Sequence, residues 1–239
     1  MLGIPLCGIN HLEGHIFGAL LDMAPPCPFI ALLVSGGHTH LYLSEYPGQY
    51  KLLGKTRDDA AGEAFDKIAK YLGYSYPGGP HIERLSKDGN ANSISLPKAM
   101  CQKGNLEFSF SGLKTAAINI GETLSVYDSK KAAADLAAAL QQTIADILEY
   151  KMKEAMKITG VRRIVISGGV VANSKFREKL DNFSKKGIDI IIPQKKYCTD
   201  NAVMIAYAGR FRLTKGDHSP LNITARPIMP LDQIPFAFQ

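Results

Sequence analysis

The sequence predicts an α/β fold, and three observations carry that prediction. Three short strand-like runs follow one another at residues 29–34, 39–45 and 48–56. Two further apolar runs, at 162–169 and 188–193, are each followed by a helical pattern. The 239 residues are 46% hydrophobic and 21% charged, as in an ordinary globular protein with room for a large core.

The first run, Phe29–Val34, is continuously apolar, which is typical of a buried strand. The second alternates like a half-buried strand, and short turns join all three, so they predict an antiparallel meander. Apolar spacing predicts helices at 11–22, 62–72, from 111, 130–158, 173–186 and 200–213. We expect a sharp loop at 76–80, irregular chain at 86–110 and an extended, proline-containing tail from 214. This order of elements matches a ribonuclease-H-like lobe, the repeating unit of actin-like ATPases.

Charge and cysteine content narrow the class of protein. A net charge of +6 and a pI of about 9.0 permit a polyanionic partner such as RNA but do not require one. The four cysteines form no CxxC pair, which excludes zinc-ribbon and thioredoxin-type sites and favours reduced thiols. The sequence has neither a run of membrane-spanning length nor a signal-peptide pattern. We therefore expect a cytoplasmic protein without a membrane partner.

The motif HLEGH places His11 and His15 one helical turn apart on one face. Two imidazoles at this spacing can chelate a metal ion if a third ligand comes from elsewhere. The motif is neither HExxH nor HxxEH, so a metalloprotease would lack its general base at the expected place. The alternative is a pair of ordinary histidines.

Two glycine turns follow predicted strands, in LLVSGGHTHL (32–41) and in RRIVISGGVVAN (162–173). Gly36 and Gly37 allow backbone amides to approach a phosphate closely, and His38 and Thr39 can add donors. The second turn leads into a helix N-terminus, which favours anion binding. A plain hairpin turn and a structural strand–helix turn are the alternatives.

Acidic residues gather where predicted helices begin. Asp58, Asp59, Glu63 and Asp66 surround one helix start, where the helix dipole alone favours acids, so spacing does not separate capping from catalysis. Asp200, in YCTDN, is a candidate third metal ligand or only an N-cap.

Seven motifs in the same order carry a specific resemblance: HLEGH, LLVSGGHTHL, DDAAGEAFDK, YPGGP, FSFSGLKTA, SGGVVAN and YCTDNAVMIAYAG. Together they closely resemble the TsaD family, the tRNA N6-adenosine threonylcarbamoyltransferases, over nearly the whole chain. The last motif is similar to the bacterial or organellar versions. The resemblance implies an actin-like ATPase (ASKHA, ribonuclease-H-like) fold that lacks most of the N-terminal lobe, because a GIETSCDET-like opening motif is not found.

The resemblance also implies a site. Its metal ligands are His11, His15 and Asp200. Its substrate contacts are Leu33, Val34, Ser35, Gly36, Gly37, Asp66, Gly79, Glu83 and Asn173. No residue is assigned as general base. The implied cofactors are one divalent ion, Fe(2+) or Zn(2+), and an adenine nucleotide, either threonylcarbamoyl-AMP or ATP. The implied reaction moves the threonylcarbamoyl group to the adenosine on the 3′ side of a tRNA anticodon.

The implied domain organisation has three parts. Residues 1–28 are a remnant of the N-terminal lobe with the metal-binding helix, 29–213 are the C-terminal ribonuclease-H-like lobe with a helical insertion, and 214–239 are an extended tail. The implied partners are tRNA and either a TsaB-like paralogue with a TsaE-like ATPase or, in an organellar type, a second copy. Two alternatives remain: an inactive truncated remnant that binds only metal or nucleotide, and a metalloprotease, which HLEGH alone supports.

Overall fold

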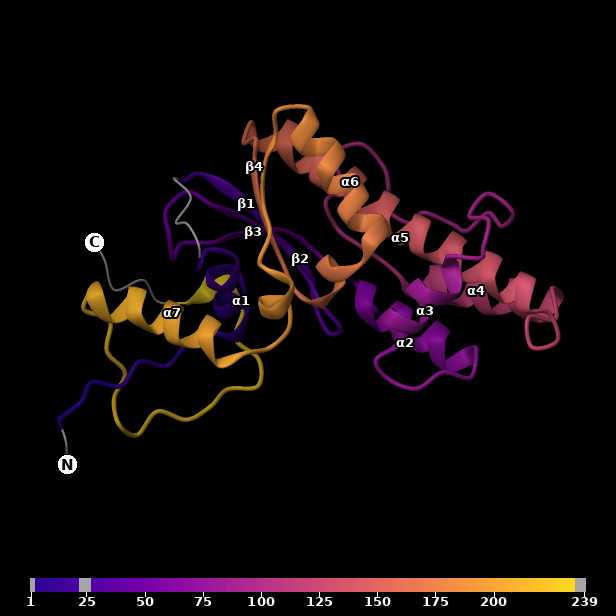
Figure 1. Ribbon diagram of the computed structural model, residues 1–239. Helices are drawn as coiled ribbons and strands as arrows, with labels where there is room; N and C mark the ends of the chain where they lie inside the picture. Colours follow the sequence, from indigo (N-terminus) through magenta and orange to yellow (C-terminus); the bar gives the residue numbers. More distant parts are fainter. Residues whose placement is uncertain (1–2, 22–26, 235–239) are drawn as a thin grey trace.

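A five-stranded mixed sheet forms the centre of the protein (Figure 1). The structure, a computed structural model, describes residues 3–21 and 27–234. The strands are β1 (Phe29–Val34), β2 (Thr39–Ser44), β3 (Lys51–Lys55), β4 (Arg163–Ser167) and β5 (Asp189–Ile191), in the order β3-β2-β1-β4-β5. β3, β2 and β1 pair antiparallel, whereas β1, β4 and β5 pair parallel. All five predicted strands, and the predicted meander, are confirmed.

Strand β1 lies at the centre of the sheet and supplies both hydrophobic cores, because successive side chains of a strand point to opposite faces. Ile30, Leu32 and Val34 belong to the larger core, and their neighbours Phe29, Ala31 and Leu33 to the smaller one. All six are buried. The continuous apolar run that predicted this strand thus reflects burial on both faces.

Five helices cover the face of the larger core (Figure 1). They are α2 (Ala61–Tyr71), α3 (Gly78–Ser86), α4 (Ser111–Thr123), α5 (Lys130–Thr159) and α6 (Ser174–Lys185). The 30-residue α5 is the longest of them, and it ends at Gly160, whose φ of 72° is left-handed, a conformation that glycine adopts without steric cost. Its many buried alanines let neighbouring elements approach closely.

Two helices, α1 (His11–Ala19) and α7 (Ala202–Thr214), lie on the other side of the sheet (Figure 1). α1 packs on the sheet through Leu12, Ile16 and Ala19, which join the smaller core. Two α1 glycines face α7. A Cβ on Gly14 would lie 2.8 Å from Ile205 Cδ1, and one on Gly18 would lie 3.1 Å from Met204 Cβ. The absence of side chains at these positions therefore permits a close α1–α7 contact.

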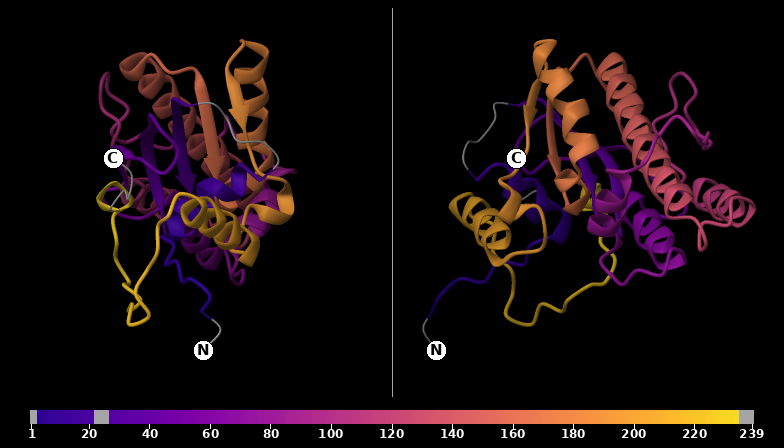
Figure 2. Two further views of the ribbon diagram at one scale, coloured as in Figure 1. Left: turned by 90° about the vertical axis from the view of Figure 1, so that its left-hand side faces the viewer. Right: turned by 45° about the vertical axis from the view of Figure 1, so that its right-hand side comes forward.

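The C-terminal segment runs back beside the first described residues (Figure 2). Between α7 and Ile234, the last described residue, the chain forms turns at Lys215–Gly216 and Leu221–Asn222 and a short 3-10 helix, η3 (Leu231–Gln233). The Ser219 amide donates to the Leu6 carbonyl at 2.7 Å, and the Asn10 side chain donates to the Met229 carbonyl at 2.8 Å. Leu231 is buried in the smaller core. The segment thus holds the chain that leads into α1.

The structure corrects one sequence-based expectation and rules out one alternative. The loop expected at 76–80 contains the start of α3, which begins at Gly78 and was not predicted. A helix tolerates Pro80 in its first turn because amides there have no partner within the helix. At α7 the N-cap is Asn201, whose side chain accepts from the Met204 amide at 2.9 Å, and not Asp200. The predicted end of the first helix, Asp22, lies outside the described residues.

Within residues 3–21 and 27–234, no helix has both the length and the apolar character needed to cross a membrane.

Candidate metal and nucleotide site

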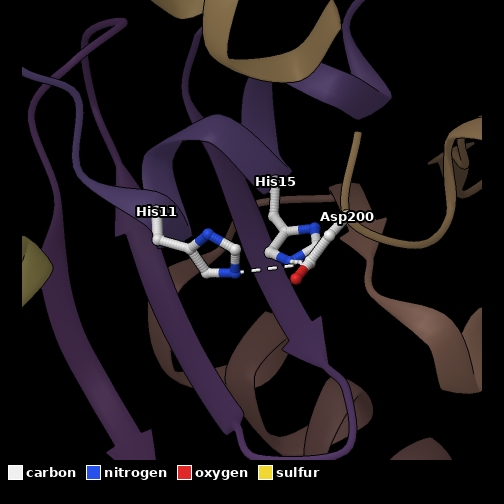
Figure 3. Close-up of side chains that lie close together, drawn as sticks. All are labelled: His11, His15 and Asp200. Atoms are coloured by element: carbon white, nitrogen blue, oxygen red, sulfur yellow. Dashed lines mark ion pairs between the residues drawn. The ribbon is translucent and has the colours of Figure 1, made fainter. Parts of the chain in front are cut away.

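Three side chains with metal-binding atoms meet between α1 and the start of α7 (Figure 3). His11 and His15 project from the same face of α1, and Asp200 comes from the loop before α7. The Asp200 Oδ1 atom lies 3.4 Å from His11 Nε2 and 3.1 Å from His15 Nε2. All three ligand atoms lie within 4.8 Å of one another. The structure thus brings together the two histidines of HLEGH and the aspartate of CTDN, the residues that the sequence indicated.

The donor set fits a transition-metal ion. Bonds of 2.0–2.1 Å in a tetrahedral site place neighbouring ligand atoms about 3.3 Å apart, close to both nitrogen–oxygen distances here. The His15 side chain is 5% exposed, but those of His11 and Asp200 are 50% and 74% exposed. An ion held by these residues would keep positions open to solvent, as catalytic rather than structural sites do.

Electrostatics favour the ligating form of the buried histidine. Burial lowers the pKa of His15, the neighbouring His11 lowers that pKa further, and Asp200 raises it in part. The net shift is downward, so the ring is neutral at pH 7, the form that binds metals. Burial and His11 also lower the pKa of His38, at the end of the first glycine turn. That turn therefore lies within electrostatic reach of the three side chains.

The glutamate of HLEGH points away from this cluster. Glu13 is fully buried, and its two oxygens lie 2.6 and 2.9 Å from Arg212 Nε and Nη2 on α7. A carboxylate held in this way has no access to a substrate or to an attacking water. The structure therefore removes the candidate base of a metalloprotease.

The first glycine turn is closed by its own hydrogen bonds. The Ser35 amide donates to the His38 carbonyl at 2.8 Å, and the His38 amide donates to Ser35 Oγ at 3.2 Å. Gly36 and Gly37 are exposed, and a Cβ on Gly37 would meet nothing within 4 Å. The amides of these two glycines, rather than that of Ser35, are the ones available to a ligand. Leu33 and Val34 are buried in β1, so only their backbone could reach one.

The second glycine turn packs directly on the first. Gly168 has a φ of 105°, and a Cβ there would lie 2.3 Å from the Val34 carbonyl oxygen. A 3-10 turn, η1 (Gly169–Ala172), then leads to Asn173, which caps α6 by accepting from the Phe176 amide at 3.0 Å. The Asn173 Nδ2 donates to Gln141 Oε1 at 2.7 Å. Both polar atoms of the Asn173 side chain thus have partners within the protein.

Asp66 lies on α2, and Gly79 and Glu83 lie on α3. A Cβ on Gly36 would lie 4.0 Å from Asp66 Oδ2, while Asp66 Oδ1 accepts from the Gly78 amide at 2.7 Å. Glu83 Oε1 accepts from the Ser174 amide at 3.1 Å, which joins α3 to the start of α6. Gly79 borders open space. The predicted substrate residues therefore lie on adjoining segments, although several of their polar atoms are engaged in holding those segments together.

Sequence reasoning missed a groove of about 340 Å³ beside Asp66, lined also by Lys67, Lys70, Tyr74, Ser75 and Tyr76. The exposed tyrosines of YSYP, just before PGGP, were its only sequence signal. A second hollow, of about 320 Å³, is apolar and lies between α1, α7 and the start of β1. None of the three candidate metal ligands lines either hollow.

The mixed sheet, with its two touching glycine turns and helices on both faces, defines an α/β protein with the actin-like fold. Solved structures show the same fold. The full-length HypF crystal structure in its phosphate- and nucleotide-bound form is similar over 90% of this chain and 44% of that one, with a TM-score of 0.69 and 12% identity. HypF from T. kodakarensis is similar over 90% and 38%, with a TM-score of 0.64 and 14% identity.

Sequence comparison identifies the family. The profile of TsaD, tRNA N6-adenosine threonylcarbamoyltransferase, matches residues 1–207. A protein of that name from Geotalea uraniireducens is 44% identical over 234 residues, which are 98% of this chain and 68% of that relative. The chain belongs to the TsaD family of tRNA-modifying transferases, which confirms the resemblance seen in its motifs.

Proposed function

We propose that the chain transfers the threonylcarbamoyl group of threonylcarbamoyl-AMP to N6 of the adenosine 3′ of the anticodon, in tRNAs that read codons beginning with adenine. Family membership and one structural observation support this function. His11, His15 and Asp200 interact electrostatically with His38, which ends the glycine turn in which Gly36 and Gly37 are exposed. The arrangement offers a metal centre next to a phosphate-binding turn.

The three side chains would hold one divalent ion. Two imidazole nitrogens and one carboxylate suit either Fe(2+) or Zn(2+), the two ions that we propose. When bound, such an ion supplies Lewis-acid polarisation of a carbonyl oxygen and orients the donor.

The remaining residues would bind the donor and position the reaction. The amides of Gly36 and Gly37 hold its phosphate, while Asp66 and Glu83 offer carboxylate oxygens to the adenosine portion. Asn173 contributes through its backbone, because its side chain is engaged in the cap of α6. The adenine N6 attacks the carbamate carbon, the bond from that carbon to the phosphate oxygen breaks, N6 loses a proton and AMP leaves. Positioning carries much of the rate because an exocyclic amine is a weak nucleophile.

The site also suggests where tRNA docks. Lys195 and Lys196, in the 3-10 turn η2 (Lys195–Tyr197), are exposed and lie a few residues before Asp200. Lysines there would meet the phosphates that flank the target adenosine. We propose a TsaB-like paralogue and a TsaE-like ATPase as protein partners of a bacterial-type enzyme, or a second copy in an organellar type. The division into 1–28, 29–213 and 214–239 is likewise a proposal, and α1 shares the smaller core with β1.

The test measures threonylcarbamoyladenosine in tRNA by mass spectrometry, in cells depleted of their own transferase and expressing this chain. We expect the modification to return with the wild-type chain and to be lost with His11→Ala or Asp200→Ala. Glu178→Gln, on the exposed face of α6, is a matched control that should leave the modification intact. A soluble, folded wild-type chain that restores nothing would contradict the transferase proposal and favour a protein that only binds metal or nucleotide.

A further inference from the structure

A buried ion pair joins α1, which carries His11 and His15, to α7, which follows Asp200 in the chain. Arg212 of α7 donates from Nε and Nη2 to the two oxygens of Glu13 on α1, at 2.6 and 2.9 Å. The side chains are 3% and 0% exposed. We propose that the Glu13–Arg212 pair is the positioning device of the metal centre: it sets α1 against α7 so that His11 and His15 meet Asp200. This inference rests on the proposed metal site.

The ligands require such a device because they come from two separate elements. His11 and His15 move together as part of α1, while Asp200 moves with the start of α7. Any slide or rotation of α1 relative to α7 changes both nitrogen–oxygen distances together. The contact between the two helices therefore decides whether the three atoms can share one ion.

The pair is well placed to fix the rotation of α1. At about 100° per residue, Glu13 points roughly 160° away from both His11 and His15 on the helix circumference. Anchoring Glu13 to Arg212 therefore fixes the rotation of α1 about its axis, and with it the direction in which His11 and His15 point. A two-point guanidinium–carboxylate contact defines orientation as well as distance, which a single lysine contact would not do.

His15 lacks the usual support of a ligating histidine. In most metal sites the second ring nitrogen donates to a carboxylate or carbonyl that fixes the ring. His15 Nδ1 is buried and has no hydrogen-bond partner among the described residues. The orientation of the ring thus depends on the position of the α1 backbone, which the ion pair controls.

The same arginine links the pair to the segment after α7. Arg212 Nη1 lies 2.6 Å from Asp217 Oδ2. The hydroxyl of Tyr50, just before β3, donates to Glu13 Oε1 at 3.5 Å. Removing one partner alone would leave an uncompensated buried charge and threaten folding. Replacement of both partners by apolar residues of similar size usually preserves stability.

The test therefore uses the double variant Glu13→Leu/Arg212→Met, in the full chain. Zn(2+) affinity is measured by competition with a chromophoric chelator, and the visible absorption of bound Co(2+) reports coordination. We expect normal thermal unfolding, a Zn(2+) affinity reduced by about 10–100-fold and an altered Co(2+) spectrum. Affinity for AMP alone should stay within about twofold, because the glycine turns do not contact the pair.

Two further variants separate positioning from stability. Arg212→Lys keeps the charge without the two-point contact, so we expect an intermediate Zn(2+) affinity; it also serves as the readout if the double variant does not fold. Lys179→Met is the matched control. It removes contacts of 2.7 and 2.8 Å to Asp146 and Glu149 between α6 and α5, far from α1. It should lower stability but leave Zn(2+) affinity unchanged.

The outcomes separate this inference from the proposed function. A folded double variant, or a folded Arg212→Lys chain, that binds Zn(2+) as tightly as the wild type would overturn the positioning role alone. A wild-type chain that binds neither Zn(2+) nor Co(2+) would overturn the metal site and the inference together. Equal losses of Zn(2+) affinity in Lys179→Met and the double variant would show that stability, rather than position, governs the site.

Discussion

Gly168 lies against the carbonyl of Val34 so closely that no other residue fits at its position. A Cβ there would sit 2.3 Å from the Val34 oxygen and 3.2 Å from the Ser35 nitrogen. The two glycine turns, which are far apart in the sequence, therefore form one continuous backbone surface at the ends of β1 and β4. A substitution that moves the backbone of one turn therefore also disturbs the packing of the other.

We expect Gly168→Ala to destabilise the protein and weaken nucleotide binding together. The added methyl group meets backbone rather than a flexible side chain, and a φ of 105° strains any residue with a Cβ. The loss should be about 2–4 kcal/mol in the free energy of unfolding. Urea unfolding and AMP titration measure both effects. Gly169→Ala is the control, since its Cβ would meet only a Thr199 methyl at 3.9 Å.

Asp58 holds the segment FSFS at the start of α4. Its carboxylate accepts from the Phe110 and Ser111 amides at 2.8 and 3.1 Å, and from the hydroxyls of Ser109 and Ser111 at 2.6 and 2.7 Å. We expect Asp58→Asn to cost about 1–2 kcal/mol of unfolding free energy, a value reduced by solvent exposure. Asp181→Asn, at an exposed position of α6, should not change the free energy of unfolding measurably. Equal stability of the two variants in urea would contradict this role.

Short-range patterns in the sequence predicted most of the fold, and their failures have physical causes. The strands and the long helix follow from apolar runs and from alternation, which are local signals. Helix α3 was missed because GGP favours a loop, whereas Gly78 is needed where a Cβ would lie 2.6 Å from Asp66 Cα. Asp200 and Asn201 are both typical caps, so only the backbone geometry assigns the cap to Asn201.

The protonation of His40 should make stability depend on pH. Burial, with smaller contributions from His38 and Lys55, lowers the pKa of His40 from 6.5 to about 4, while Asp232 raises it slightly. The unfolded chain therefore binds this proton more readily between pH 6.5 and 4. Stability is fully present above pH 6.5 and falls as the pH drops through this window, by about 2 kcal/mol after allowance for solvent screening.

The measurement is urea unfolding at pH 4.5 and pH 7.5 for the wild type and for His40→Gln. The difference between the two proteins isolates His40 from other groups that titrate in this range. We expect the variant to lose less stability than the wild type on acidification. Parallel pH profiles would show that the His40 ring is not protected from protonation.

Salt dependence tests the proposed contacts of Lys195 and Lys196 with tRNA phosphates. Each phosphate contact contributes about 0.7–0.9 to the slope of log affinity against log salt concentration. The double change of these lysines to glutamine should therefore reduce the slope by about 1.4–1.8. The same change at Lys185 and Lys186, exposed where α6 ends, alters net charge equally and should leave the slope nearly unchanged. An equal effect of both pairs would indicate only a general electrostatic attraction.

Part of the candidate site was predictable from local sequence patterns, as most of the fold was. His11 and His15 share a helix face by spacing alone, and the family motifs supplied Asp200, which the structure places beside them. The Glu13–Arg212 contact spans 199 residues, and no local pattern signals it. The internal bonds of Asn173 and Ser35 were also unforeseen, because cap and turn geometry depends on the packed backbone.

The long-range contacts around α1 have a consequence for how the protein is made. Asn10 and Gly8, just before α1, bind Met229 and Ser219, which the ribosome adds more than two hundred residues later. Arg212 and Asp200 also emerge long after the helix that they complete. The candidate cluster of His11, His15 and Asp200 can therefore form only after the segment that leads into α7 has left the ribosome.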